Sequence, residues 1–146
     1  MARVGIRVSF TAIRSTRRAL NTKKMTKALD DYTYGFVREV VEYLSEYPEV
    51  DDTDYVRTLT LLKSWKIVKT RSFGANIGYR FENYARDYRG KYYARLVHGG
   101  PRGDGQYWLH AANGWIRTDE AVDEIGGREG FRSGAQGVIN RILRVA

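Results

Sequence analysis

The chain has 146 residues, enough for one domain with its own hydrophobic core. Hydrophobic residues make up 42% of it and cysteine is absent, which excludes a disordered chain, a disulfide framework and a thiolate site. The net charge is +8 and no apolar run reaches the ~18 residues of a bilayer-spanning helix, so we expect no membrane partner.

Charge is divided into blocks along the chain. Residues 1–29 hold eight Lys or Arg and no acid, whereas residues 30–54 hold nine acids and only Arg38 as a base. Residues 55–95 are basic again, with ten Lys or Arg against Glu82 and Asp87. Such blocks are either solvated faces that pair within the fold, or patches that match neighbouring subunits or nucleic acid.

The N-terminal part predicts a strand followed by one long helix. Residues Arg3–Phe10 alternate between apolar and polar side chains, which is the period of a strand. Across Met25–Tyr47 apolar residues recur every three or four positions, which predicts a helix of about seven turns. Asn21 or Thr22 can cap its start, and Pro48 cannot continue it.

The middle of the chain predicts an antiparallel sheet. Residues 61–70 alternate like a strand with a helical start, and residues 75–84 predict a second strand after a turn at Gly74. Residues 91–99 begin as a third strand or as a short helix that leads into one. Short connections favour antiparallel pairing. We therefore expect a single α+β domain over residues 1–146, with the long helix packed on a small sheet.

The last third predicts a protruding loop and two helices. The Gly- and Pro-rich residues 99–106 interrupt the preceding element and form the loop. Thr118, followed by two acids, resembles an N-cap with a favourable first turn. Gly126 and Gly127 end that helix, and the apolar spacing over Phe131–Leu143 predicts an amphipathic C-terminal helix.

The two histidines do not form a recognisable catalytic or metal site. His98 and His110 are twelve residues apart with Asp104 as the sole nearby carboxylate, whereas zinc normally takes three or four ligands. No serine stands in a nucleophile elbow, and the loop lacks the Gly-Lys-Ser/Thr ending of a phosphate-binding loop. We therefore expect no enzyme, no cofactor and no metal; a small hydrolase built on these three residues is the least favoured alternative.

Residues 79–95 support a second alternative function. Five cations alternate there with five tyrosines, a pattern that can neutralise phosphates and stack bases. The same residue types dominate protein–protein contacts, and the chain carries no helix-turn-helix, zinc-finger or RNA-recognition signature. A basic nucleic-acid-binding module is therefore the alternative to a structural protein. Its residues are Arg80, Arg86, Arg89, Lys91 and Arg95 with Tyr79, Tyr84, Tyr88, Tyr92 and Tyr93.

Three short segments stand in a recognisable order. Val56–Ser64 reads V-x-T-x-x-L-x-x-S, Tyr93–Gly100 reads Y-A-x-x-V-x-x-G, and Trp108–Ala112 reads W-L-x-A-A. In this order they resemble the tail-completion and neck proteins of long-tailed bacteriophages, the group of HK97 gene product 10. Leu59 stands where that family has Gly, and His98 where it has an acid.

The resemblance implies a non-enzymatic α+β subunit of a ring, often a hexamer, where the head connector meets the tail. It implies that residues 99–106 reach an adjacent subunit, the tail tube or the connector, with Tyr107, Trp108 and Trp115 at the base of this loop. The implied partners are copies of the chain, a connector or head-closure protein, and a tail tube or terminator protein. The resemblance also implies non-specific proximity to DNA in the channel, and a place in the virion after assembly in the host cytoplasm. A head-closure or tail-terminator protein shares this size and geometry.

The expected contact residues fall into three groups. The first belongs to the loop and its flank, the second to the basic N-terminal third, and the third to the acidic side of the long helix. The second and third groups can pair between neighbouring subunits of a ring. The residues are Arg102, Asp104, Tyr107 and Trp108; Arg14, Arg17 and Arg18; and Glu39, Glu42 and Glu46.

Overall fold

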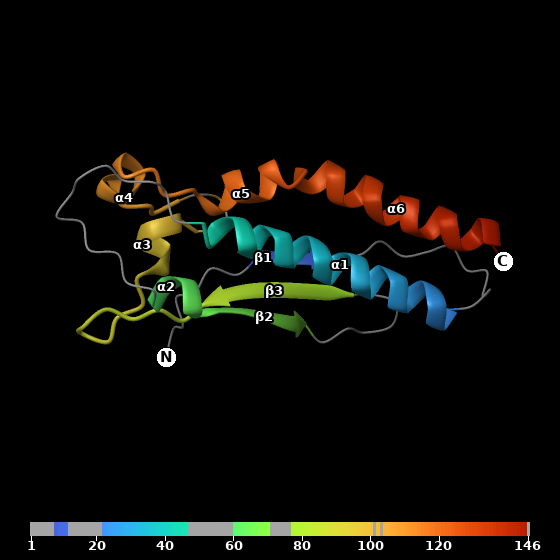
Figure 1. The fold of residues 1–146 in the computed structure, drawn as a ribbon, viewed down its shortest axis with the longest axis horizontal. Coiled ribbons are helices and arrows are strands. Elements are labelled where there is room, and N and C mark those ends of the chain that lie inside the picture. The colour runs from blue at the N-terminus through green and yellow to red at the C-terminus, as the bar shows by residue number, and fades with distance from the viewer. Residues whose placement is uncertain are drawn as a thin grey trace.

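Short strands and amphipathic helices give this chain the α+β fold that its sequence predicts (Figure 1). The computed structural model describes residues 8–11, 22–46, 60–70, 77–100, 102 and 104–145. The elements in chain order are β1 (Val8–Thr11), α1 (Thr22–Leu44), α2 (Thr60–Lys63), β2 (Trp65–Thr70), β3 (Gly78–Asn83), α3 (Ala94–His98), α4 (Trp108–Ala112), α5 (Thr118–Glu124) and α6 (Gly127–Val145).

The sheet consists of three antiparallel strands in the order β1-β3-β2. Along the central strand β3, Tyr79, Phe81 and Asn83 are buried, whereas Arg80 and Glu82 between them are half-buried. This alternation is the two-residue period of a strand with one face against a core. The predicted strands in residues 61–70 and 75–84 are thereby confirmed, including the helical start, which is α2.

Helix α1 lies between the sheet and α6 (Figure 1). On the sheet side, the carboxylate of Asp30 accepts a hydrogen bond from the Tyr79 hydroxyl at 2.8 Å and pairs with Lys69 Nζ at 2.6 Å. Toward α6, the rings of Phe36 and Phe131 meet edge to face with centroids 5.1 Å apart. The helix is therefore covered by two layers.

This central position explains why α1 buries more than the stripe that its sequence predicts. The predicted positions Met25, Leu29, Phe36, Val40 and Leu44 are buried, but Thr33 and Val37 are fully covered as well. A helix with neighbours on two sides buries more than one narrow stripe of its surface.

The predicted C-terminal end of α1 is wrong: the sequence places it at Tyr47, whereas the helix ends at Leu44. The N–H of Ser45 is shared between the carbonyls of Val41 and Glu42, and its hydroxyl bonds the Val41 carbonyl at 2.7 Å. Such side-chain bonding to the preceding turn competes with helix continuation. Asn21 and Pro48, like residues 3–7 of the predicted first strand, lie outside the described residues.

The structure differs from two other local predictions, at residues 91–99 and at the start of the helix near Thr118. At residues 91–99 the short-helix alternative holds as α3, but no strand follows it in the described part of the chain, and Tyr92 makes only a single bridge with Arg86. Gly99, with φ 70°, ends α3. The helix predicted at Thr118 begins there, but Arg117 occupies the cap position and Thr118 is buried inside the first turn.

The amphipathic C-terminal helix is confirmed as α6, which buries Phe131, Ala135 and Ile139 and leaves Leu143 exposed. It begins at Gly127, so of the two glycines predicted as the break only Gly126 lies between α5 and α6. Within the described ranges, neither α6 nor any other helix combines the length and apolarity needed to cross a bilayer.

Candidate contact surface

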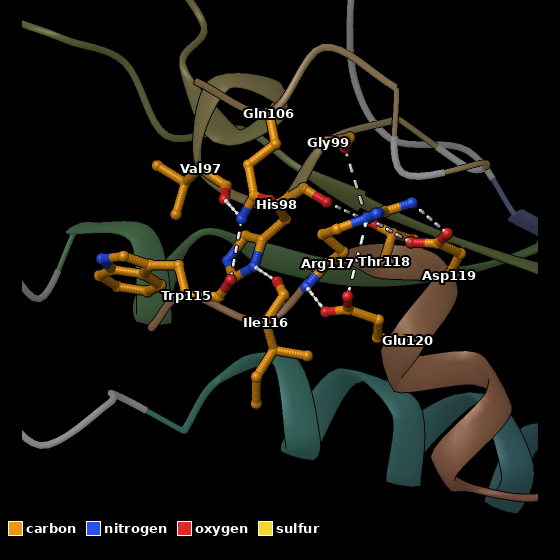
Figure 2. A network of polar contacts seen from close by, with 10 residues as sticks. All are labelled: Val97, His98, Gly99, Gln106, Trp115, Ile116, Arg117, Thr118, Asp119 and Glu120. Carbon is orange, nitrogen blue, oxygen red and sulfur yellow. Dashed lines mark hydrogen bonds and ion pairs between the residues drawn. The ribbon is translucent and has the colours of Figure 1, made fainter. Parts of the chain in front are cut away.

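A buried polar network holds the two ends of the loop that follows α3. The Gln106 side-chain amide donates hydrogen bonds to the carbonyls of Val97 and Trp115, both at 2.8 Å (Figure 2). The Thr118 hydroxyl donates to the His98 carbonyl at 3.1 Å. These three bonds join α3, the end of the loop and the start of α5, so the loop leaves and enters the fold at fixed points.

His98 is a fully buried member of this network. Its Nδ1 lies 2.8 Å from the carbonyl of Ile116, so Nδ1 carries the hydrogen (Figure 2). The indole rings of Trp65 and Trp115 lie against the imidazole, with centroids 5.6 and 5.4 Å away. Burial lowers the pKa of His98 from 6.5 to about 4, so the ring is neutral at pH 7.

A second cluster fixes the start of α5. The guanidinium of Arg117 donates to both carboxylate oxygens of Asp119, at 3.0 and 2.6 Å, and the backbone N–H of Arg117 donates to Glu120 at 3.0 Å (Figure 2). Carboxylates in the first turn also favour the helix dipole. The acids that the sequence places in this turn therefore stabilise the helix itself.

The two loop residues expected to make contacts, Arg102 and Asp104, differ in their bonding within the fold. Gly99 and Gly100 are buried, and Arg102 and Asp104 are exposed. However, the Asp104 carboxylate is bound by Arg95 of α3, and its carbonyl accepts the N–H of Gly100 at 2.6 Å. A β-carbon on Gly100 would collide with the same carboxylate, which would then have to move. Asp104 thus closes the loop onto α3, and Arg102 is left exposed.

An apolar surface lies beside the loop, formed by Leu96, Tyr107, Trp108 and Leu109. All four side chains are exposed, Trp108 at 67% and Tyr107 at 47%. The N–H of Tyr107 bonds the carbonyl of Leu96 at 2.8 Å, and its ring centroid lies 5.6 Å from that of Trp108. Exposed aromatic side chains on a fixed backbone are typical anchors of protein interfaces.

This surface corrects the expected base of the loop. Of the three aromatic residues assigned to it, only Trp115 is buried, whereas Tyr107 and Trp108 are exposed. Sequence reasoning proposed Tyr107 and Trp108 as contact residues, and it gave no role to Leu96 or Gln106. The helical period of α3 could have indicated that Leu96 is exposed, because a helix that buries Val97 and His98 turns Leu96 outward. No pattern marked Gln106.

Of the remaining expected contact residues, the acidic group lies in the part of the chain that the structure describes and the basic group does not. Glu39, Glu42 and Glu46 are exposed, and Glu42 pairs with Arg38 at 3.3 Å within α1. Arg14, Arg17 and Arg18 lie outside the described residues.

The residues of the hydrolase alternative have different local roles. His98 is enclosed by tryptophans, and Asp104 bonds Arg95 rather than either histidine. Burial also lowers the pKa of His110, whose ring lies 6.1 Å from that of Tyr107. Among the described residues, no three His, Cys, Asp or Glu side chains form a group that could hold a metal ion.

The chain was compared with protein-family models, with curated proteins and with solved structures, and it matches none of them.

Proposed function

We propose that this chain is a structural, non-enzymatic subunit of the neck or tail end of a long-tailed bacteriophage. In this proposal, copies of the chain form a ring, hexameric as in the family it resembles, that joins the tail to the head connector and leaves a channel for DNA. The order of strand, long helix, sheet, loop and C-terminal helix agrees with what the resemblance implies.

One observation supports the proposal most strongly: the apolar surface of Leu96, Tyr107, Trp108 and Leu109 is exposed, while a buried network fixes the backbone beneath it. Exposed aromatic rings contribute to stability only when a partner covers them. A ring closes when one face of a subunit complements another face of its neighbour, and a fixed apolar surface is suited to such a contact.

The proposal is tested in a phage from which the gene for this chain is deleted. We expect filled heads and separate tails in negative-stain micrographs, with joining restored when the chain is supplied from a plasmid. Adding the purified chain first to heads or first to tails then distinguishes a head-closure role from a tail-completion or terminator role. Joined particles in the deletion strain would end the proposal.

The same complementation assay tests the apolar surface. We expect Trp108→Ser to lower the yield of joined particles by about tenfold or more, as for an anchor residue of an interface. Leu143→Ser on α6 is the matched control, because Leu143 is also an exposed apolar residue but lies in another layer of the fold. Equal yields from the two variants would show that this surface makes no contact in the particle.

A further inference from the structure

The chain between β3 and α3 forms a hairpin that its own backbone holds together. Arg86 and Tyr92 face each other as an antiparallel bridge, and the N–H of Asp87 donates to the carbonyl of Lys91 at 2.9 Å. We call residues 86–92 the basic hairpin. Figure 1 shows it as the yellow segment that extends past α2 and the adjacent ends of β2 and β3.

The only acid of the basic hairpin is used inside the turn. The Asp87 carboxylate accepts the backbone N–H groups of Arg89 and Lys91, at 2.9 and 2.8 Å. The side chains of Arg86, Arg89 and Lys91 are exposed, and none of them pairs with an acid among the described residues. The hairpin therefore presents three cations to solvent.

Aromatic rings lie directly beside these cations. Tyr88 is 89% exposed, and the Arg89 guanidinium lies 5.1 Å from its ring centroid on one side, so the other side of the ring faces solvent. The Arg86 guanidinium lies 4.5 Å from the Tyr92 ring, and its Nη2 donates to the Tyr92 hydroxyl at 2.6 Å. The hairpin thus carries two pairs of a cation and a tyrosine, one across its arms and one in its turn.

The alternation continues from the hairpin onto the sheet. The Tyr92 and Tyr84 rings meet edge to face at 6.4 Å, and Lys66 Nζ of β2 lies 5.3 Å from the Tyr84 ring centroid. Lys66 and the basic hairpin together form a continuous row of cations and tyrosines. At the sheet end of this row the Tyr84 hydroxyl donates to the Glu82 carboxylate, so the path for a negatively charged chain with planar groups lies along the hairpin.

The other members of the Arg/Tyr stretch are engaged within the fold. Tyr79 is buried against α1, Arg80 pairs with Glu82 at 2.9 Å, and Arg95 pairs with Asp104. The pattern of residues 79–95 therefore reduces to the hairpin and its extension.

We infer that the basic hairpin binds single-stranded nucleic acid, with Arg86, Arg89 and Lys91 on phosphates and the open face of Tyr88 stacked on a base. Cations next to aromatic rings are the combination that binds unpaired strands without sequence preference. An acidic protein surface would also use these cations, but it does not supply the successive planar bases on which Tyr88 can stack. The inference concerns the single subunit and does not depend on ring formation.

The test is fluorescence anisotropy of the full chain with a labelled mixed-sequence strand of about 20 nucleotides, longer than the ~4–16 nucleotides of typical single-strand sites. We expect Tyr88→Ala to weaken binding about tenfold, and the double variant Arg89→Gln with Lys91→Gln to weaken it at least as much. Loss of two phosphate contacts should also reduce the slope of log Kd against log salt by about 1.4. The control is Arg132→Gln with Arg141→Gln, which removes two exposed cations from α6, on the far side of α1 from the sheet.

Several results would overturn the inference. One is a double hairpin variant that binds as tightly as the α6 control, since net charge alone would then explain binding. Another is equal affinity for the strand and its duplex, with no effect of Tyr88→Ala. A third is equal displacement by polyglutamate, which would indicate an acidic protein partner. Thermal unfolding of each variant confirms that the fold is intact.

Discussion

The phenol of Tyr32 in α1 occupies the space that a β-carbon on Gly134 in α6 would fill. The Tyr32 ring stacks on Phe131 with centroids 5.6 Å apart, and its hydroxyl donates to the Phe131 carbonyl at 3.2 Å. Glycine at position 134 therefore permits a ring from one helix to lie directly on the backbone of the other, and this contact sets the separation of α1 and α6.

Adding one methyl group at this contact should destabilise the fold. Gly134→Ala forces Tyr32 away from its hydrogen bond and its stacking partner, which costs about 1–3 kcal/mol. Gly137→Ala, three residues later in the same helix, has nothing within 4 Å of the new β-carbon and should stabilise by about 0.5–1 kcal/mol. Urea unfolding of both variants measures the difference, and equal midpoints would show that α6 shifts to accommodate the methyl group.

The amide of Gln106 should be essential for the buried network. Gln106→Glu keeps the shape but replaces two donors with a carboxylate that faces the carbonyls of Val97 and Trp115. We expect a loss of about 2–3 kcal/mol at pH 7, partly recovered at lower pH where the carboxyl gains a proton. Gln136→Glu is the matched control, because the Gln136 amide donates to Asn140 on the exposed side of α6. Similar unfolding free energies for the two variants would contradict the role of Gln106.

His98 should make the fold sensitive to mild acid. The unfolded chain binds a proton at His98 near pH 6.5, whereas the folded chain binds it only near pH 4, because burial lowers the pKa. The free energy of unfolding therefore has its full value above pH 6.5. It falls as the pH drops toward 4, by about 3 kcal/mol in total.

The test of this pH dependence is a series of denaturant titrations between pH 4 and 7. His98→Asn retains an N–H donor for the Ile116 carbonyl but no titrating ring, so its stability should vary much less over this range. His110→Asn removes a less buried histidine and should keep the larger part of the dependence. An unchanged pH profile in His98→Asn would contradict the assignment.

The acidic side of α1 is predicted to contact a basic surface of a neighbouring subunit. Reversing the exposed Glu39, Glu42 and Glu46 to Lys should weaken assembly in low salt, with a smaller effect in high salt because ions screen the contact. Folding should change little, since the ion pair that these three acids form among the described residues, Arg38–Glu42, is solvent-exposed. Sedimentation velocity measures assembly, with Asp123→Lys plus Glu124→Lys as the control; unchanged assembly in low salt would count against this contact.

The parts of the fold with a regular period were predictable from the sequence. Burial at Met25, Leu29 and Phe36 follows the helical period, and the alternation of Tyr79 and Phe81 with polar neighbours follows the strand period. Both signals are local, and they persist because the side chains at these predicted positions all face the core.

The candidate surface was predictable only in part, because it depends on contacts that carry no period. Trp108 and Trp115 both flank the loop, yet one is exposed and the other buried, and the difference arises from packing of Trp115 on His98. Gln106 is important only because the fold brings the carbonyls of Val97 and Trp115 to opposite sides of its amide.

The position of α1 between two layers has a consequence for folding during synthesis. In the sheet β1 pairs with β3, and Tyr32 reaches its carbonyl partner on Phe131 across 99 residues of chain. On the ribosome, the aromatic side of α1 stays uncovered until α6 has been made, so the final tertiary contacts form only near the end of translation. During that interval the nascent chain presents Tyr32 and Phe36 to chaperones.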